Sequence, residues 1–364
     1  MTNNKMSKIN YLLIALAFTT LFSCAREKEE SSREIQERIL DAYINTHCPN
    51  ATRLSSGLTI IQLSEGSGVK PGDYDGIYIH YNTFDLNGTC QSTTDSLESR
   101  LLGTYDPAKY YGPSLFVLDG TVTKGMTELL KKMNKGATAT AIIPPWLTVA
   151  TNSNTSGYTD KGQQSQVSMI YNIKAGLVID DVEKFQIDSL ESYSRLNFIP
   201  KIDSTSKGYY FRNFIHPNGV PAKDTIESGT KVNIWYVGRL LDGYVFDTNI
   251  ADTAKKYKIY DSSNDYEPLS VTMKATWEEM AEYSNNTGSS TSSNAEGSQS
   301  FVPGFCRAIK SMTYKDNAVS FFMSGLGYGS SGKMESGKGV PEYAMLRFDL
   351  WMGLATDSRF PPTK

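Results

Sequence analysis

Apolar residues along this chain recur in short runs, many with a two-residue alternation, which is typical of β-strands. A helical spacing is rare and is clear only near the N-terminus, where five apolar residues form one stripe. The strand-like runs are Gly57–Leu63, Ile77–Thr83, Val167–Ile173, Val232–Val237, Val319–Phe322 and Met345–Met352, and the stripe is Ile35, Ile39, Leu40, Tyr43 and Ile44. The pattern predicts an α+β fold dominated by antiparallel sheet.

A longer apolar run, from Tyr11 to Phe22, follows Lys5 and Lys8 and stops just before Cys24. A cationic start and an apolar stretch too short to span a bilayer indicate a secretory signal over residues 1–23. The tetrapeptide Leu-Phe-Ser-Cys resembles the bacterial lipobox, whose cysteine becomes the lipidated first residue of the mature protein. Cys24 is therefore expected to hold the protein to a membrane through lipid. An ordinary signal peptide with an incidental cysteine is the alternative.

Residues 24–51 are expected to form a polar tether followed by the amphipathic helix. Ala25 stands where an Asp would resemble an inner-membrane retention signal, so the outer membrane is expected. The acidic residues behind Cys24 resemble the surface-export signals of Bacteroidetes lipoproteins, although charged tethers are also common for solubility alone. The periplasmic face and the cell surface both remain open.

The composition limits the kinds of partner and bound ion that are expected. The net charge is −3 without any basic run, so no nucleic-acid partner is expected. Three histidines, none in a pair at ligand spacing, argue against a metal site. Past the lipobox, Cys48, Cys90 and Cys306 do not make a disulfide framework, although one pair could form in an oxidising compartment.

The sequence repeats itself once. Tyr81 and Tyr236 each lead into a Gly-containing turn, and Pro113 and Pro268 are separated by the same number of residues. Further along, Val122 to Met126 matches Phe301 to Phe305, and Val149 matches Tyr328, at one longer offset. A single insertion in the second copy, around Trp277–Gln299, explains the change in offset. Its run of Ser, Thr, Asn and Gly predicts a mobile surface loop.

Two domains follow from the repeat, 52–176 and 207–355, with a connector over 177–206 and a tail over 356–364. The connector includes a predicted short helix near Asp181–Arg195. Both copies carry a long stretch after their first motif, 92–112 and 247–267, which indicates duplication of an already expanded domain.

Motifs of the second copy occur in the order found in FKBP-type peptidyl-prolyl isomerases, which the chain therefore resembles. They are Tyr236-Val-Gly, Asp242-Gly-Tyr-Val-Phe246-Asp247, Phe301-Val302-Pro-Gly-Phe305, Gly327-Tyr328-Gly329 and Val340-Pro341 ahead of Leu346-Arg-Phe348-Asp349. The resemblance implies two FKBP-like domains, each an antiparallel sheet wrapped on a short helix, with no cofactor. It also implies a peptidyl-prolyl cis-trans isomerase that acts on proline-containing segments of exported proteins during folding.

The family pattern assigns a catalytic pocket to the second copy. Matched residue by residue, it consists of Tyr236, Phe246, Asp247, Val302, Phe305, Tyr328 and Phe348. Phe305, as the floor, replaces the usual Trp, and Leu269 replaces the usual Phe. The first copy has a degenerate pocket, because the Phe-Asp pair is replaced around Cys90–Ser92. Its matching positions are Tyr81, Val122, Met126, Val149 and Tyr171.

Isomerisation requires neither a nucleophile nor a metal, because the barrier of about 18–20 kcal/mol comes from amide resonance. A twisted amide has less charge separation than a planar one, so an apolar pocket binds it preferentially. A single aromatic residue of this kind usually belongs to a hydrophobic core. The occurrence of all the motifs in the family's order favours a functional pocket. A non-catalytic peptide-binding or chaperone lipoprotein is the alternative, and an accessory lipoprotein of a secretion or gliding machine is a third possibility.

Overall fold

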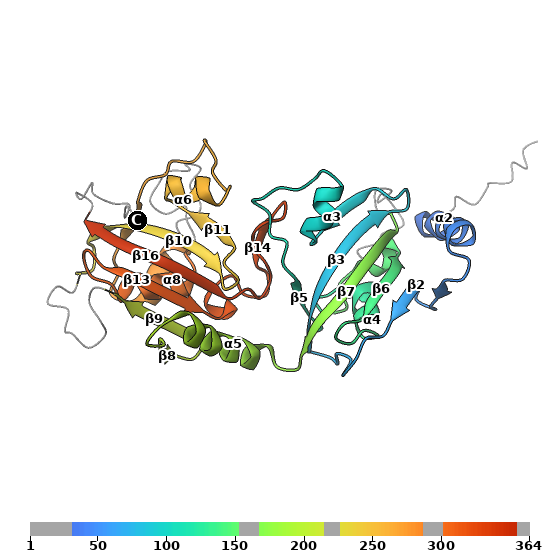
Figure 1. The fold of residues 1–364 in the computed structure, drawn as a ribbon, viewed down its shortest axis with the longest axis horizontal. Coiled ribbons are helices and arrows are strands. Elements are labelled where there is room, and N and C mark those ends of the chain that lie inside the picture. The colour runs from blue at the N-terminus through green and yellow to red at the C-terminus, as the bar shows by residue number, and fades with distance from the viewer. Residues whose placement is uncertain (1–30, 153–166, 215–225, 287–300, 355–364) are drawn as a thin grey trace, which may run out of the picture.

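The computed structural model describes residues 31–152, 167–214, 226–286 and 301–354. The predicted signal, Cys24 and the tail lie outside these residues. Two antiparallel sheets form separate lobes, joined by a helix that runs beneath the second lobe (Figure 1). The expected fold class, α+β with two antiparallel sheets, is confirmed. In the part of the chain so described, no helix is both long and apolar enough to cross a membrane.

The first sheet has the strand order β1-β2-β6-β7-β3-β4, with β5 paired to β3. Its strands are β1 (Thr52–Arg53), β2 (Thr59–Ser64), β3 (Gly76–Asp85), β4 (Cys90–Thr93), β5 (Ser114–Val117), β6 (Thr138–Ile143) and β7 (Met169–Ile179). The short helix α4 (Lys124–Leu130) buries Met126, Leu129 and Leu130 in the core that this sheet contributes to.

The second sheet repeats that order as β8-β9-β13-β16-β10-β11, with β12 paired to β10. Its strands are β8 (Ser204–Ser206), β9 (Tyr209–Asn213), β10 (Lys231–Leu240), β11 (Val245–Thr248), β12 (Leu269–Thr272), β13 (Asn317–Phe322) and β16 (Leu346–Leu354). The helix α8 (Pro303–Lys310) packs into its core, and β14 (Lys333–Glu335) pairs with β15 (Lys338–Val340) in a separate hairpin.

The duplication extends to pairing register and loop detail. Ile77 faces Phe116 in the first sheet as Val232 faces Val271 in the second. Each long stretch forms a six-residue helix, α3 (Ser96–Leu101) or α6 (Ala251–Lys256). Each then holds a stacked tyrosine pair, Tyr105 with Tyr111 at 5.4 Å and Tyr260 with Tyr266 at 4.9 Å between ring centroids.

The N-terminal helix α2 (Ser32–His47) begins at a capping box between Ser31 and Glu34. Only the second half of its expected apolar stripe is packed. Leu40 is fully buried, whereas Ile35 and Ile39 keep 36% and 46% of their surface exposed. The helix therefore docks on the first domain by one end of the stripe.

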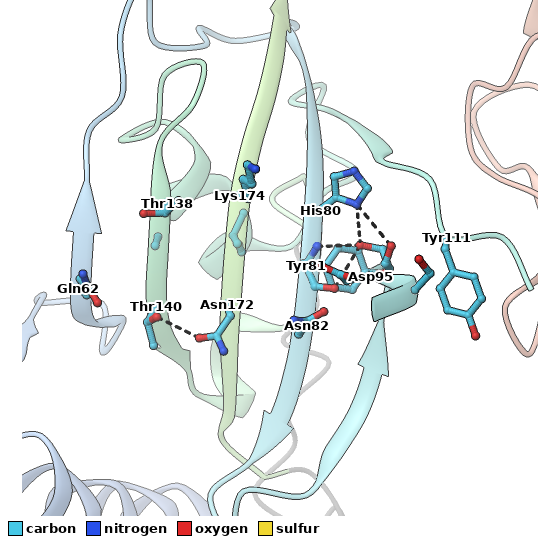
Figure 2. Close-up of a pocket in the computed structure, with 14 residues that line it drawn as sticks. Gln62, His80, Tyr81, Asn82, Asp95, Tyr111, Thr138, Thr140, Asn172 and Lys174 are labelled. Atoms are coloured by element: carbon cyan, nitrogen blue, oxygen red, sulfur yellow. Dashed lines mark hydrogen bonds between the residues drawn. The ribbon is translucent and has the colours of Figure 1, made fainter. Parts of the chain in front are cut away.

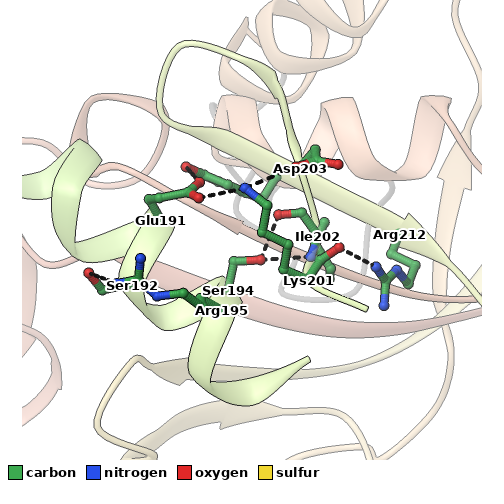
Figure 3. A network of polar contacts seen from close by, with 9 residues as sticks. Glu191, Ser192, Ser194, Arg195, Lys201, Ile202, Asp203 and Arg212 are labelled. Atoms are coloured by element: carbon green, nitrogen blue, oxygen red, sulfur yellow. Dashed lines mark hydrogen bonds and ion pairs between the residues drawn. The ribbon is translucent and has the colours of Figure 1, made fainter. Parts of the chain in front are cut away.

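Helix α5 (Val182–Asn197) lies within the predicted connector and packs on the second sheet through the fully buried Leu190. Figure 3 shows the polar contacts that hold it. The Ser194 hydroxyl donates to the Ile202 carbonyl at 2.6 Å and accepts from the Ile202 N–H at 2.8 Å. Glu191 pairs with Lys201 at 2.7 Å. The predicted connector is thus shared: β7 extends through Ile179 in the first sheet, the start of α5 packs against that sheet, and the rest of α5 packs on the second lobe.

The predicted mobile loop is wrong over its first part. Residues Trp277–Asn286 form helix α7, which packs beside α8. Met280 and Ala281 are buried in the second core, while Trp277 packs against it from the edge. Apolar residues at positions i, i+3 and i+4 make a helical stripe, which outweighs the polar composition. The rest of the insertion, 287–300, lies outside the described residues.

The three described cysteines, Cys48, Cys90 and Cys306, are free thiols. Cys306 is completely buried on α8, and burial raises the pKa of its thiol to about 12. It therefore behaves as a small apolar core residue.

Candidate functional site

The seven residues predicted for the catalytic pocket come from distant parts of the second copy and lie together. Each residue lies on the inner face or at the end of the strand or helix that carries it. Tyr236 lies on β10, Phe246 and Asp247 on β11, Val302 and Phe305 at the start of α8, Tyr328 just after η2 (Ser324–Leu326), and Phe348 on β16. We call this set the aromatic site.

Phe348 is at the centre of the aromatic site. Its ring centroid lies 5.0 Å from that of Phe305, 5.8 Å from Phe246 and 6.2 Å from Tyr236, all in tilted or edge-to-face geometry. Aromatic rings favour such arrangements because the positive edge of one ring meets the negative face of another. Phe305 and Phe348 are buried, whereas Tyr236, Phe246 and Tyr328 remain partly open to solvent. The buried pair forms a floor and the open residues form its rim.

Polar groups of the aromatic site are fixed by one hydrogen bond. The Tyr236 hydroxyl donates to Asp247 Oδ2 at 2.8 Å. Desolvation raises the pKa of Asp247, although the Tyr236 hydrogen bond and the charge of Lys333 oppose the shift. Asp247 still exposes surface to solvent, so it lies at the mouth of the site and not in the core. Tyr236 thus orients Asp247 at the rim.

Tyr328 is the second phenol of the aromatic site and is affected by the same carboxylate. Burial, with a smaller effect from the charge of Asp247, raises its pKa to about 12. The phenol therefore keeps its proton at neutral pH and can donate a hydrogen bond. The Lys333 ammonium lies 5.6 Å from the centroid of the Tyr328 ring.

Gly238 is a site-forming residue that the sequence analysis did not single out. A Cβ at this position would lie 2.7 Å from Phe246 Cζ and 3.0 Å from Phe348 Cε1. In the first sheet, the same register position holds Thr83, which is buried. A comparison of the two copies could have revealed this role, because glycine stands where the first copy has threonine, and only glycine leaves room for both rings.

The degenerate site of the first copy gathers most of its predicted residues. Tyr81, Val122, Met126 and Tyr171 pack around the first core. Val149 does not belong to that group; it lies after η1 (Pro145–Leu147), where its carbonyl accepts the Lys124 N–H at 2.8 Å. The helix caps show Thr123, and not Val122, in the position of Val302.

Polar chemistry also differs between the copies. Register places Ser92 opposite Thr83 as Asp247 lies opposite Gly238, so Gln91 precedes Ser92 as Phe246 precedes Asp247. Tyr81 interacts with the Ser92 hydroxyl, a contact that lowers its pKa against the larger raising effect of burial. The carboxylate and the rim ring are therefore both missing from the first copy.

The first domain contacts the hairpin that follows Tyr328. Lys338 Nζ on β15 lies 2.9 Å from Asp106 Oδ2, and the Tyr244 hydroxyl donates to the Ala108 carbonyl at 2.8 Å. The other strand of this hairpin carries Lys333, whose charge acts on Asp247. The two lobes therefore meet beside the aromatic site, through the long loop of the first copy (Figure 1).

Among the described residues, no group of three or more His, Cys, Asp or Glu is arranged to hold a metal ion. The aromatic site itself offers aromatic rings, one carboxylate and two phenols. An apolar floor with hydrogen-bond donors at its rim suits a compact apolar ring attached to an amide.

No protein-family model matches the chain, and no curated protein matches it in sequence. Solved structures of FKBP proteins are similar. The three FKBP domains of wheat FKBP73 match at 14% identity over 82% of this chain and 95% of that chain, with a TM-score of 0.26. FkpA from Escherichia coli matches at 19% identity over 49% and 74%, with a TM-score of 0.29.

A peptidyl-prolyl cis-trans isomerase from Pseudomonas syringae pv. tomato is also similar, at 15% identity over 48% of this chain and 96% of that chain, with a TM-score of 0.28. At these identities and TM-scores the matches carry no argument about the fold or the activity of this chain. Any argument about activity therefore depends on the contacts within this chain.

Proposed function

We propose that the second domain is a peptidyl-prolyl cis-trans isomerase that assists the folding of exported proteins. One observation carries the proposal: residues from separate motifs gather around Phe348, with the Tyr236–Asp247 hydrogen bond at the rim. A core requires only apolar side chains of suitable volume. A hydrogen-bonded carboxylate with a raised pKa at the mouth of a ring cluster is typical of functional sites.

In this proposal, the pyrrolidine ring of an X–Pro segment rests on Phe305 between Phe246 and Phe348. The half-rotated amide is less polar than the planar amide, so this apolar surface stabilises it more than it stabilises the ground state. Tyr328, which holds its proton at neutral pH, donates to a substrate carbonyl. Asp247 is held by Tyr236 and places its negative charge near the rotating carbonyl carbon.

The cellular setting is also a proposal. Cys24, within its lipobox-like tetrapeptide, carries lipid and anchors the protein to the outer membrane, on the periplasmic face or at the cell surface. Metabolic labelling with a fatty-acid analogue tests this. Label should enter the wild-type chain and be lost from Cys24→Ala, and an unlabelled wild type that is still secreted would leave only an ordinary signal peptide.

Exchange NMR on a short X-Pro peptide tests the activity. The full chain should accelerate cis-trans exchange, and Phe246→Ala should reduce kcat/KM at least tenfold because the ring contact is lost. Tyr328→Phe removes one hydrogen bond, so a loss of about two- to tenfold is expected. Gln91→Ala is the matched control, since Gln91 holds the position of Phe246 in the first sheet.

A non-catalytic peptide-binding or chaperone lipoprotein is the competing function. It is favoured by the first copy, where Ser92 and Thr83 replace the residues that form the rim and make room for the rings. If the full chain leaves exchange unchanged but still binds the X-Pro peptide or suppresses aggregation, this second function replaces isomerisation. If Gln91→Ala reduces exchange as much as Phe246→Ala, the activity has been assigned to the wrong domain.

A further inference from the structure

The outer face of the first sheet, away from α4, contains an open groove of about 480 Å³ (Figure 2). Strands β2, β6, β7 and β3 form its floor, and the start of α3 with Tyr111 forms one wall. The aromatic site lies in the other lobe, so this groove is separate from it. We call it the amide groove.

One row of polar side chains crosses the floor of the amide groove. Gln62, Thr140, Asn172 and Asn82 are direct register partners on four consecutive strands. Neighbouring strands lie about 4.8 Å apart, so the row offers a polar group at each such step. The row therefore presents polar groups to a ligand at regular intervals.

The two asparagines of the row are oriented by hydroxyl groups. Thr140 Oγ1 donates to Asn172 Oδ1 at 3.0 Å, and Thr93 Oγ1 donates to Asn82 Oδ1 at 2.6 Å. Each carbonyl is thereby engaged, which leaves the amide nitrogens as donors toward the groove. Figure 2 shows Asn172 and Asn82 on adjacent strands with their side chains on the same face.

The second sheet provides an internal comparison, because each position has a register counterpart there. His80, Asn82 and Lys174 correspond to Trp235, Val237 and Trp351. In the second lobe these apolar residues pack beneath the segment that includes Ile250 and Tyr257. The face around Trp235 is therefore apolar and covered, whereas the face around His80 is open and polar. The row itself differs less, because the counterpart of Asn172 is Asp349, which pairs with Arg239 and Arg347.

The charge of the amide groove is balanced. Lys174 supplies one positive charge and Asp95 one negative charge. The remaining lining residues carry amides, hydroxyls, a histidine ring or tyrosine rings, apart from the apolar Ala139 and Ile173. The groove therefore has no net charge that would attract a strongly charged ligand. A neutral ligand with many groups that both donate and accept hydrogen bonds fits this lining, because the asparagine amide nitrogens can donate to it and the hydroxyls can donate or accept.

We propose that the amide groove binds a neutral glycan. The strand spacing of about 4.8 Å is comparable to the width of one pyranose ring, so successive sugar units can meet successive polar side chains. An extended peptide presents like-facing groups about every 6.6 Å, which does not match this row. The occupant is a free oligosaccharide.

The test uses the full chain and a panel of neutral linear tetrasaccharides with glucose, mannose and N-acetylglucosamine units, observed by saturation-transfer NMR. An acidic tetrasaccharide and an uncharged Gly-Ser peptide are the comparison ligands. At least one neutral tetrasaccharide should bind, and Asn82→Ala or Asn172→Ala should each weaken it about tenfold through loss of a hydrogen bond. Asn87→Ala is the control, since it removes an exposed amide from the turn after β3, outside the groove.

A second variant tests the comparison between the sheets. Asn82→Val introduces the residue of the second sheet, Val237, at the same register and should abolish binding while the domain remains folded. The proposal is overturned if no neutral tetrasaccharide binds at millimolar concentration, or if Asn82→Ala and Asn87→Ala bind equally well. Preferential binding of the Gly-Ser peptide at this face would replace the glycan with a polypeptide. Exchange of an X-Pro peptide should be unaffected by any of these variants.

Discussion

Replacement of Gly238 by alanine is the sharpest test of how the aromatic site is built. The added Cβ would lie 2.7 Å from Phe246 Cζ, 2.8 Å from Phe246 Cε2 and 3.0 Å from Phe348 Cε1. Carbon atoms in good contact are about 3.5–4.0 Å apart, so both rings must move by roughly 0.5–1 Å. The change therefore acts on the rings without removing any of their atoms.

The expected cost follows from two opposing effects. Overpacking of this kind destabilises a domain by about 1–3 kcal/mol. Alanine restricts the unfolded chain more than glycine does and recovers about 0.5–1 kcal/mol within a strand. The net destabilisation of Gly238→Ala is therefore between about 0 and 2.5 kcal/mol, measured by urea unfolding. Displacement of Phe246 and Phe348 should also reduce kcat/KM for the X-Pro peptide at least tenfold.

Two further variants separate the cause from a general glycine effect. Gly325→Ala adds a Cβ whose nearest neighbour, Met323 Cε, is 3.8 Å away, so it should cost less than 0.5 kcal/mol. Adding Phe246→Leu to Gly238→Ala should recover stability relative to the sum of the single changes, without recovering activity. A Gly238→Ala protein with wild-type stability and wild-type exchange would refute the steric argument for this glycine.

Three further predictions concern other contacts. Ser194→Ala leaves the buried Ile202 N–H and carbonyl without their partner, so it should cost about 1–3 kcal/mol in urea unfolding, whereas Ser192→Ala on the same helix should be nearly neutral. Asp247 has a folded-state pKa above its ordinary 3.8, so its ionisation penalises folding increasingly as pH rises above that value. The stability of Asp247→Asn relative to wild type should therefore increase from pH 3 to pH 7, and a constant difference would contradict the raised pKa. Tyr244→Phe removes the hydrogen bond to Ala108 between the lobes and should speed hydrogen exchange in the β14–β15 hairpin; unchanged exchange there would mean that the contact does not hold it.

The residues of the aromatic site could be named from the sequence because they belong to ordered motifs, and the structure places them together, while their role in catalysis stays a prediction. Phe246 and Asp247 follow a Gly-containing turn, and Phe305 lies in the first turn of the helix that begins at Pro303, so each has one natural orientation. The role of Gly238 was not predicted, because it depends on two rings that approach from β11 and β16. The distance between position 238 and the two rings is set by the tertiary structure, so the sequence does not give it.

The insertion in the second copy is a case in which the prediction from the sequence was wrong. A composition rich in Ser, Thr and Asn suggested a loop, yet Trp277, Met280 and Ala281 form a helical stripe that packs on the second core. The apolar spacing was present in the sequence. It was outweighed by the neighbouring polar run, since composition averages over residues that lie on different faces.

By itself, the sequence determined the strand pattern, the duplication and the chemistry available at each position, because these follow from local periodicity and residue type. It also restricted the first copy to a degenerate site, since Ser92 cannot supply a carboxylate. Tertiary structure alone decided which faces are covered. His80 and Trp235 occupy one register position, but only packing makes one face an open amide groove and the other a buried layer, because burial depends on what the remainder of the chain places over it.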